Sequence, residues 1–134
     1  MANNPATFYE QEINRIIKHH LLPEYQYVKV RQSKIFMEKY HSEKIDLQKI
    51  AASAFMSRFH YIRIFQQVYG VTPRQYLRDL RISKAKELLK TGVPVTQVCF
   101  DVGYESLPTF SNAFKRGTGY SPKEFQSINK SNPE

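Results

Sequence analysis

The stretch TPRQYLRDLRISKAKELLKTG, residues 72–92, decides the fold that the sequence predicts. It begins with Thr72, a residue type that caps helices, and Pro73, a residue type favoured at the first helical position. Gly92 is placed to end a helix. Apolar residues recur between these ends at helical spacing, at Leu77, Leu80, Ala85, Leu88 and Leu89. The stretch therefore predicts one helix, about 28 Å long if it covers residues 73–91.

The sequence repeats itself around this helix. The residues Ala51, Phe65, Gly70, Thr72, Pro73 and Tyr76 are matched in the same order by Cys99, Phe114, Gly119, Ser121, Pro122 and Phe125. The offset is 48 positions before each predicted turn and 49 after it, so the second copy carries one extra turn residue. We therefore expect two similar helical units joined by a rigid spacer.

The first copy has the pattern of a helix-turn-helix, in which a tight turn joins a short helix to a second helix. Asp46 caps a helix over 47–54, and Ser57 caps a helix over 58–69 that ends at Gly70. The side chains expected to face the core are Leu47, Ile50, Ala51, Ala54, Tyr61, Ile64, Phe65 and Val68. The opposite face of the second helix carries Arg58, Phe59, Ile62, Arg63 and Gln66. This second helix is the candidate recognition helix.

The second copy follows the same pattern. Residues 95–103 repeat the short helix and the turn at Gly103, and Ser106 caps the helix over 107–117. The side chains expected inside are Val95, Val98, Cys99, Val102, Phe110, Ala113 and Phe114, and those expected outside are Pro108, Thr109, Ser111, Asn112 and Lys115. Ser121 and Glu124 form a capping box that opens a last helix, ending near residue 128.

The N-terminal part carries weaker signals. Apolar residues at helical spacing predict a helix over 8–21, ended by Pro23. The stretch EYQYVKV, residues 24–30, alternates like a strand but lacks a partner strand in this sequence, so we expect a connector. It leads into a helix near 30–42 that carries Ile35, Phe36 and Tyr40. The expected all-α fold divides into an N-terminal helical extension at 1–30, a first helix-turn-helix subdomain at 31–71, the linker helix at 72–92, a second subdomain at 93–130 and a tail at 131–134.

Composition limits the classes of partner. The 134 residues are 41% hydrophobic and carry a formal net charge of +8, which favours a polyanionic partner, nucleic acid first and an anionic membrane second. No apolar run approaches the ~18 residues of a membrane span, and the first ten residues lack a signal-peptide core. We therefore expect a soluble intracellular protein that does not act at a membrane.

The sequence gives little support for catalysis or metal binding. The single cysteine, Cys99, excludes an internal disulfide and is expected in the core. His19 and His20 are adjacent and diverge on a helix, while His41 and His60 lack partners at metal-ligand spacing. No paired carboxylates, nucleophile with a base or phosphate-binding glycine loop stands out. We expect a protein that is not an enzyme and that needs no cofactor or metal.

These motifs resemble the DNA-binding domain of the AraC/XylS family of bacterial transcription regulators. The resemblance covers about residues 31–128 and rests on Ile50-Ala51, residues 57–65, Gly70-x-x-Pro73-x-x-Tyr76, Arg81-x-x-x-Ala85-x-x-Leu88-Leu89, Val98-Cys99-x-x-x-Gly103-Tyr104, Phe110-x-x-x-Phe114-Lys115 and Gly119-x-x-Pro122. It implies two helix-turn-helix subdomains bridged by a long helix and bound to promoter DNA. The family's usual ligand-sensing or dimerisation domain is not expected, because only about 30 to 45 residues precede the repeats.

The resemblance also implies which positions read DNA. In the first recognition helix these are Phe59, Ile62 and Arg63, and in the second they are Pro108, Thr109, Ser111 and Asn112. The family often has Arg where this chain has Asn112 and Lys where it has Gln66, and Pro108 removes a side-chain donor, so base preference does not transfer from other members.

Each candidate residue has two interpretations, a contact to DNA or an ordinary place on the surface or in the packing. Arg63 has the chemistry to pair with guanine, and Asn112 with adenine; the alternative for both is a solvated side chain. Phe59 and Ile62 fit thymine methyl groups or sugars, and their alternative is packing against the preceding helix. A last group is expected at phosphates, or else merely solvated: Arg58, Gln66, Lys115 and Arg116.

The linker helix is itself basic. Its cations are Arg74, Arg78, Arg81, Lys84, Lys86 and Lys90, and Asp79 and Glu87 can pair with some of them. We expect few of these residues to touch DNA, and we expect Arg81 to brace the two subdomains through a buried salt bridge or contacts to carbonyl groups.

The leading hypothesis is a cytoplasmic, nucleoid-associated regulator that binds double-stranded DNA as a monomer and inserts its recognition helices into two successive major grooves. One alternative is a non-specific DNA- or RNA-binding protein. Another is a protein-interaction module in which the N-terminal helix docks on RNA polymerase or another partner, or in which residues 1–28 form a dimer.

Overall fold

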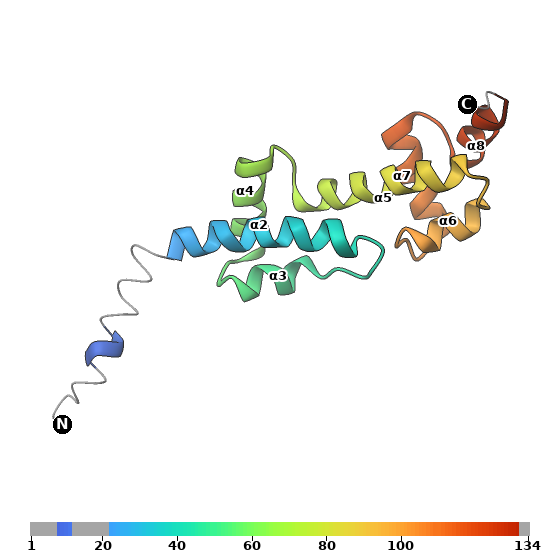
Figure 1. The fold of residues 1–134 in the computed structure, drawn as a ribbon. Coiled ribbons are helices and arrows are strands. Elements are labelled where there is room, and N and C mark those ends of the chain that lie inside the picture. Colours follow the sequence, from blue (N-terminus) through green and yellow to red (C-terminus); the bar gives the residue numbers. More distant parts are fainter. Residues whose placement is uncertain (1–7, 12–21, 132–134) are drawn as a thin grey trace.

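The computed structural model describes residues 8–11 and 22–131, and all regular elements in these residues are helices (Figure 1). After a short helical stretch at 8–11, the helices are α2 (Leu22–Tyr40), α3 (Leu47–Ser53), α4 (Arg58–Tyr69), α5 (Pro73–Lys90), α6 (Val95–Asp101), α7 (Leu107–Thr118) and α8 (Pro122–Ser131). Most of the helix predicted over 8–21 lies outside the described residues. The predicted all-α class is confirmed.

The helix α5 is the continuous rod that the sequence predicts, and the other helices are grouped at its two ends (Figure 1). The hydroxyl of Thr72 accepts a hydrogen bond from the Gln75 amide at 3.2 Å, and the Gln75 side chain accepts one from the Thr72 amide at 2.9 Å. This capping box and Pro73 define the start of the helix. The last helical residue is Lys90, and Thr91 forms the C-cap.

Two separate hydrophobic cores lie along α5, one for each helix-turn-helix unit. The first joins α2, α3 and α4 to the beginning of α5 and contains Val30, Met37, Ala51, Ala54, Met56, Tyr61, Ile64, Phe65 and Leu77. The second joins α6 and α7 to the second half of α5 and contains Ile82, Ala85, Leu89, Val98, Cys99, Val102, Phe110 and Phe114. Because α5 contributes side chains to both cores, rotation of one unit about this helix would expose apolar surface.

The prediction for residues 24–42 is confirmed only in part, because the expected helix is present up to Tyr40 but the expected connector at 24–30 is helical as well. Instead of a connector and a later helix, α2 is one helix from Leu22, with Pro23 in the first turn, where proline is tolerated. Its buried side chains are Gln26, Val30, Ser33 and Met37, which follow helical spacing. Two of these four are polar, so hydrophobicity alone did not reveal the stripe. The residues used for the prediction, Ile35, Phe36 and Tyr40, are all exposed, Ile35 by 62%.

The polar residues of this stripe attach α2 to α4. The buried Tyr61 hydroxyl donates to Ser33 Oγ at 2.8 Å, and the Ser33 hydroxyl in turn donates to the Val30 carbonyl at 2.6 Å. Burial raises the pKa of Tyr61 to about 12, because the tyrosinate would lose its hydration. Gln26 donates to the Phe55 carbonyl at 3.4 Å and its side-chain oxygen lies 3.1 Å from His60 Nε2. The first recognition helix is thus held by hydrogen bonds as well as by apolar contacts.

Two further predictions need correction. The sequence predicts Val68 in the core, but this residue is 40% exposed, and the rings that pack together at this end of α4 are those of Phe65, Tyr69 and Tyr76. The last helix, α8, continues to Ser131 rather than ending near residue 128. Its Gln126 amide donates to the carbonyls of Leu89, at 3.2 Å, and Val93, at 2.8 Å, so α8 closes the C-terminal end of α5.

Candidate nucleic-acid interface

The first recognition helix, α4, presents the predicted residues on its outer face. The Ser57 hydroxyl caps it by accepting from the His60 amide at 3.1 Å, and Gly70 ends it with a left-handed φ of 78°. Arg58, Arg63 and Gln66 are exposed, whereas Ile62 is half-buried. Phe59 is 67% exposed, so the alternative that it packs against α3 does not account for it. The Arg58 guanidinium lies over the Phe59 ring, with Cζ 5.1 Å from the ring centroid.

The second recognition helix, α7, has the same capping chemistry. The Ser106 hydroxyl accepts from the Thr109 amide at 3.3 Å and donates to the Thr109 hydroxyl at 2.7 Å. Gly119 ends the helix with φ of 84°, matching Gly70 in the first unit. Of the predicted DNA-contacting residues on α7, only Ser111 is half-buried; the exposed ones are Pro108, Thr109, Asn112, Lys115 and Arg116.

A single surface hollow of about 870 Å³ is bounded by both recognition helices. Its walls include Arg58, Phe59 and Ile62 from α4 and Ala113 and Arg116 from α7, and the beginning of α5 lies between them. The two recognition helices therefore border the same side of the molecule. The other predicted residues do not line this hollow: Arg63, Gln66, Pro108, Thr109, Ser111, Asn112 and Lys115.

Arg81, in the middle of α5, joins the two units. Its Nε donates to the His41 carbonyl at 2.7 Å, and its Nη2 donates to the Glu43 carbonyl at 3.0 Å. Its guanidinium also stacks on the ring of Tyr104, 5.5 Å away in the turn between α6 and α7. Burial lowers the pKa of Arg81. The predicted bracing role is confirmed, with carbonyl groups and a ring as partners.

The turn of the second unit fits tightly against this arginine. A Cβ atom at Gly103 would lie 2.9 Å from the His41 carbonyl oxygen, 3.0 Å from Arg81 Nε and 3.1 Å from the Ser42 carbonyl oxygen. The φ of Gly103 is 104°, which L-residues rarely adopt. The corresponding turn of the first unit places Phe55 at φ 57°, with its ring 75% exposed. The sequence pattern located both turns but not the unusual backbone of Phe55.

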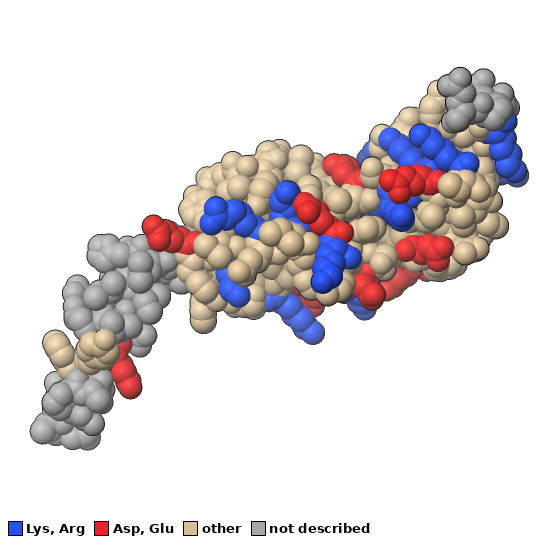
Figure 2. Space-filling view, viewed as in Figure 1, with Lys and Arg blue, Asp and Glu red and all other residues tan. Residues whose placement is uncertain are grey.

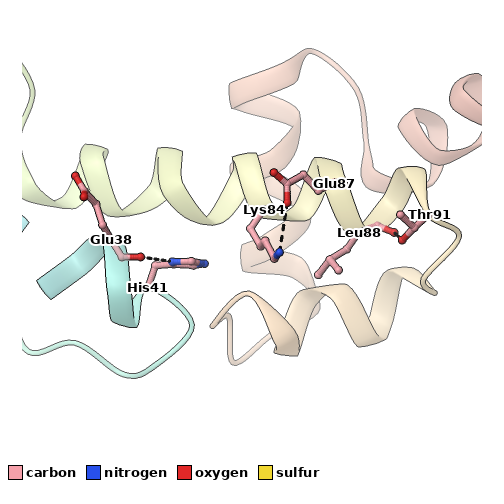
Figure 3. A network of polar contacts seen from close by, with 6 residues as sticks. All are labelled: Glu38, His41, Lys84, Glu87, Leu88 and Thr91. Carbon is pink, nitrogen blue, oxygen red and sulfur yellow. Dashed lines mark hydrogen bonds and ion pairs between the residues drawn. The ribbon is translucent and has the colours of Figure 1, made fainter. Parts of the chain in front are cut away.

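Charges elsewhere are partly paired. The view in Figure 2 shows basic and acidic side chains interspersed on the face it presents. Lys84 Nζ lies 3.3 Å from Glu87 Oε2 on α5, and Lys34 Nζ lies 3.0 Å from Glu38 Oε1 on α2. Figure 3 shows the first of these pairs on α5, together with His41, which directly follows α2. Lys84 and Lys34 are therefore each partly neutralised by a carboxylate on their own helix.

The described residues include no group of three or more His, Cys, Asp or Glu placed to hold a metal ion, and none of the described helices is long and apolar enough to cross a membrane. Cys99 is fully buried, and burial raises the pKa of its thiol. Its predicted place in the core is confirmed.

Comparison with known proteins identifies the family. A family model described as "Helix-turn-helix domain" matches residues 50–128, more than half of the chain. The chain belongs to the AraC/XylS family of transcription regulators. The matched segment begins within α3 and ends within α8, so it contains most of both helix-turn-helix units and the whole linker helix.

Curated relatives of this AraC/XylS chain are bacterial regulators. It is 32% identical over 92 residues to the probable transcriptional regulator LumQ of Photobacterium leiognathi, covering 68% of this chain and 37% of LumQ. It is 31% identical over 116 residues to the regulator GbdR of Pseudomonas aeruginosa, covering 86% of this chain and 31% of GbdR. The chain thus spans about a third of the length of these relatives.

Solved AraC-type structures share the fold. The DNA-binding domain of AdpA, solved in complex with a target DNA, superposes with a TM-score of 0.71 at 27% identity, covering 78% of this chain and 95% of that one. The C-terminal domain of AraT, a response regulator from Geobacillus stearothermophilus, gives a TM-score of 0.69 at 28% identity, covering 75% of this chain and 84% of that one.

Proposed function

We propose that this AraC/XylS-family chain binds double-stranded DNA at specific promoter sequences, with α4 and α7 in two successive major grooves. The observation that carries the proposal is that both recognition helices border one hollow on the same side of the unbroken helix α5. The AdpA domain, whose structure was solved with target DNA, has the same fold. A protein of this family with two capped recognition helices on one side is suited to one face of a duplex.

The length of α5 sets the expected geometry of the site. Its 18 residues span about 27 Å, somewhat less than the ~34 Å between successive major grooves. If α5 stays straight, the DNA must bend toward the protein for both helices to enter. We expect an asymmetric site of about 20 base pairs with two elements roughly 10 base pairs apart.

The exposed residues divide into two proposed roles. Arg63 and Asn112, exposed on opposite units, are proposed to read guanine and adenine respectively through paired hydrogen bonds. Phe59 is proposed to contact thymine methyl groups or sugars. The remaining candidates keep the roles that the sequence suggests: Ile62, Pro108, Thr109 and Ser111 at base edges, and Arg58, Gln66, Lys115 and Arg116 at phosphates.

The deciding experiment is selection of bound duplexes from a random pool, because it reports specificity, site length and spacing together. On the selected site, Arg63→Ala should relax one base position, whereas Lys115→Ala should weaken binding to all sequences and reduce the salt dependence. A pool with no enriched sequence would reject specific recognition and favour a non-specific DNA- or RNA-binding protein. Equal losses by both variants on every sequence would reject the two roles while keeping DNA binding.

We further propose that one monomer occupies each site and that residues 22–71 and 93–130 act as the two reading units. We also propose that the protein works beside RNA polymerase within the nucleoid. The earlier boundary at residue 30 falls inside α2, so we place the first unit from residue 22 onward. Sedimentation of the free and DNA-bound protein, with and without residues 1–21, tests the stoichiometry and leaves α2 intact. A dimer that dissociates on removal of these residues would refute the monomer.

A further inference from the structure

The hollow between the recognition helices is strongly basic. Besides the apolar residues, five arginines line it, contributed by α4, α5 and α7: Arg58, Arg74, Arg78, Arg81 and Arg116. Among the described residues that line it, Asp46 is the one acidic residue. Its carboxylate is already engaged, because Oδ1 accepts from the Gln48 amide at 3.0 Å and the Lys49 amide at 3.2 Å to cap α3. The hollow therefore holds an excess of positive charge.

The arginines of the hollow differ in what they already bind. Arg81 is committed to the carbonyls of His41 and Glu43. Arg78 Nη2 lies 3.6 Å from Asp79 Oδ1, beyond hydrogen-bond distance, and Arg78 Nε is buried without a hydrogen-bond acceptor. An unmatched donor costs free energy, and the partly exposed Arg78 guanidinium therefore has donors available for an anion in the hollow. Arg74 is exposed one helical turn earlier.

Arg74 and Arg78 are four residues apart, so they share one face of α5 with about 6 Å of helical rise between them. On either side of this pair, Arg58 comes from the first reading unit and Arg116 from the second. When two recognition helices occupy successive major grooves, the surface between them faces the intervening minor groove and the two sugar-phosphate strands that border it. A backbone strand is a convex, anionic ridge, and the hollow is concave and cationic.

We propose that this hollow is a phosphate cradle, in which Arg74 and Arg78 of the linker helix, together with Arg58 and Arg116, hold the DNA backbone between the two major grooves. The inference rests on the proposed function and revises the sequence-based expectation that few linker cations touch DNA. The contacts are independent of base sequence, and they position the duplex against α5 so that both helices enter. They also supply attraction toward the protein where the DNA must bend.

Salt titrations of Arg74→Gln and Arg78→Gln test the cradle on the selected site and on random duplex. Each lost phosphate contact should reduce the slope of log K against log[salt] by about 0.9 and weaken binding at 0.1 M salt by about eightfold, equally on both duplexes. Lys90→Gln is the matched control, because Lys90 is an exposed cation on the same helix outside the hollow's lining. Loss of slope in the Lys90 variant as large as in the arginine variants would overturn the cradle.

Uncharged phosphate analogues in the DNA show which backbone positions the hollow contacts. Methylphosphonates at the central backbone positions of the selected site should weaken wild-type binding but have little further effect on the Arg74→Gln, Arg78→Gln double variant. Fully additive losses would overturn the cradle. Arg78→Lys should restore the slope, and thermal unfolding of each variant separates lost binding from lost folding.

The two proposals fail in different ways. If no duplex is selected, specific recognition fails. If a site is selected and bound, but the arginine variants keep the wild-type slope and the wild-type sensitivity to central methylphosphonates, specific recognition stands and the cradle is wrong.

Discussion

Replacing Gly103 by alanine should disturb the junction between the two units more than any matched glycine substitution. The added Cβ would lie 2.9 Å from the His41 carbonyl oxygen, 3.0 Å from Arg81 Nε and 3.1 Å from the Ser42 carbonyl oxygen. Two of these three atoms belong to the backbone and cannot move by a rotamer change. The loop that follows α2 must therefore shift, and the hydrogen bonds that Arg81 donates to it must weaken.

Two other glycines provide the control for this perturbation. Gly70 and Gly119 also have positive φ, 78° and 84°, but a Cβ at either would meet nothing within 4 Å. Alanine there should cost only the left-handed conformation, about 1 to 2 kcal/mol. Gly103→Ala adds steric displacement and weakened hydrogen bonds worth about 1 kcal/mol each, so we expect a loss of about 3 kcal/mol or more.

Urea unfolding of the three variants measures these losses, and DNA binding measures their effect on the junction. Gly103→Ala should weaken binding to a site with both elements more than binding to a duplex with one element, because the orientation of the units is disturbed. Gly70→Ala and Gly119→Ala should not alter that ratio beyond their effect on folding. If the free energies of unfolding of Gly103→Ala and Gly119→Ala differed by less than about 0.5 kcal/mol, the proposed packing would be refuted. A difference that small lies within the scatter of additive mutational effects.

Three further predictions concern stability. Tyr61→Phe should lower the free energy of unfolding by about 1 kcal/mol, because the hydrogen bond to Ser33 is lost. Because the pKa of Tyr61 is raised to about 12, the wild type should also lose stability as the pH rises from 10 to 12. Urea unfolding across this pH range should show a smaller loss in the variant. Phe55→Gly should raise the thermal midpoint, because relief of the positive φ is worth about 1 kcal/mol and the exposed Phe55 side chain loses only its contact with Tyr25; a lower midpoint would contradict this prediction. Phe110→Ala, at a fully buried site, should cost about 3 to 5 kcal/mol in urea, and a loss below 1 kcal/mol would contradict its place in the second core.

The sequence predicted the features that local chemistry determines. Capping residues such as Thr72, Ser57 and Ser106, and the glycines that end α4 and α7, act within a few residues of their own position. Their helices therefore begin and end close to where the pattern placed them. The two cores followed because the apolar spacing on each side of residue 72 is helical and repeated.

The sequence did not predict features that depend on packing between distant segments. The buried face of α2 contains Gln26 and Ser33, which form hydrogen bonds with Phe55 and Tyr61, on or next to α4. A hydrophobic pattern cannot identify such a face, so α2 was predicted too short and on the wrong stripe. The prediction for Val68 was wrong for a related reason, because the packing at this end of α4 involves Tyr76 of α5 as well as Phe65 and Tyr69.

The candidate site shows the same division between local and distant information. The exposed residues of α4 and α7 could be predicted because each helix has one apolar and one polar face. The hollow between them could not, because its arginines are separated by up to 58 positions, from Arg58 to Arg116, and come from three helices. Their meeting depends on how both units dock on α5.

The charges of α5 divide along its length, and this division explains how one helix serves both structure and binding. Near its beginning, Arg74 and Arg78 face the hollow between the reading units. At its middle, Arg81 is taken up by protein carbonyls and by the ring of Tyr104. Further along, Lys84 pairs with Glu87. Because the middle arginine fixes the angle between the units, the earlier arginines hold a constant position relative to both recognition helices, and a rigid arrangement loses less conformational entropy when the DNA binds.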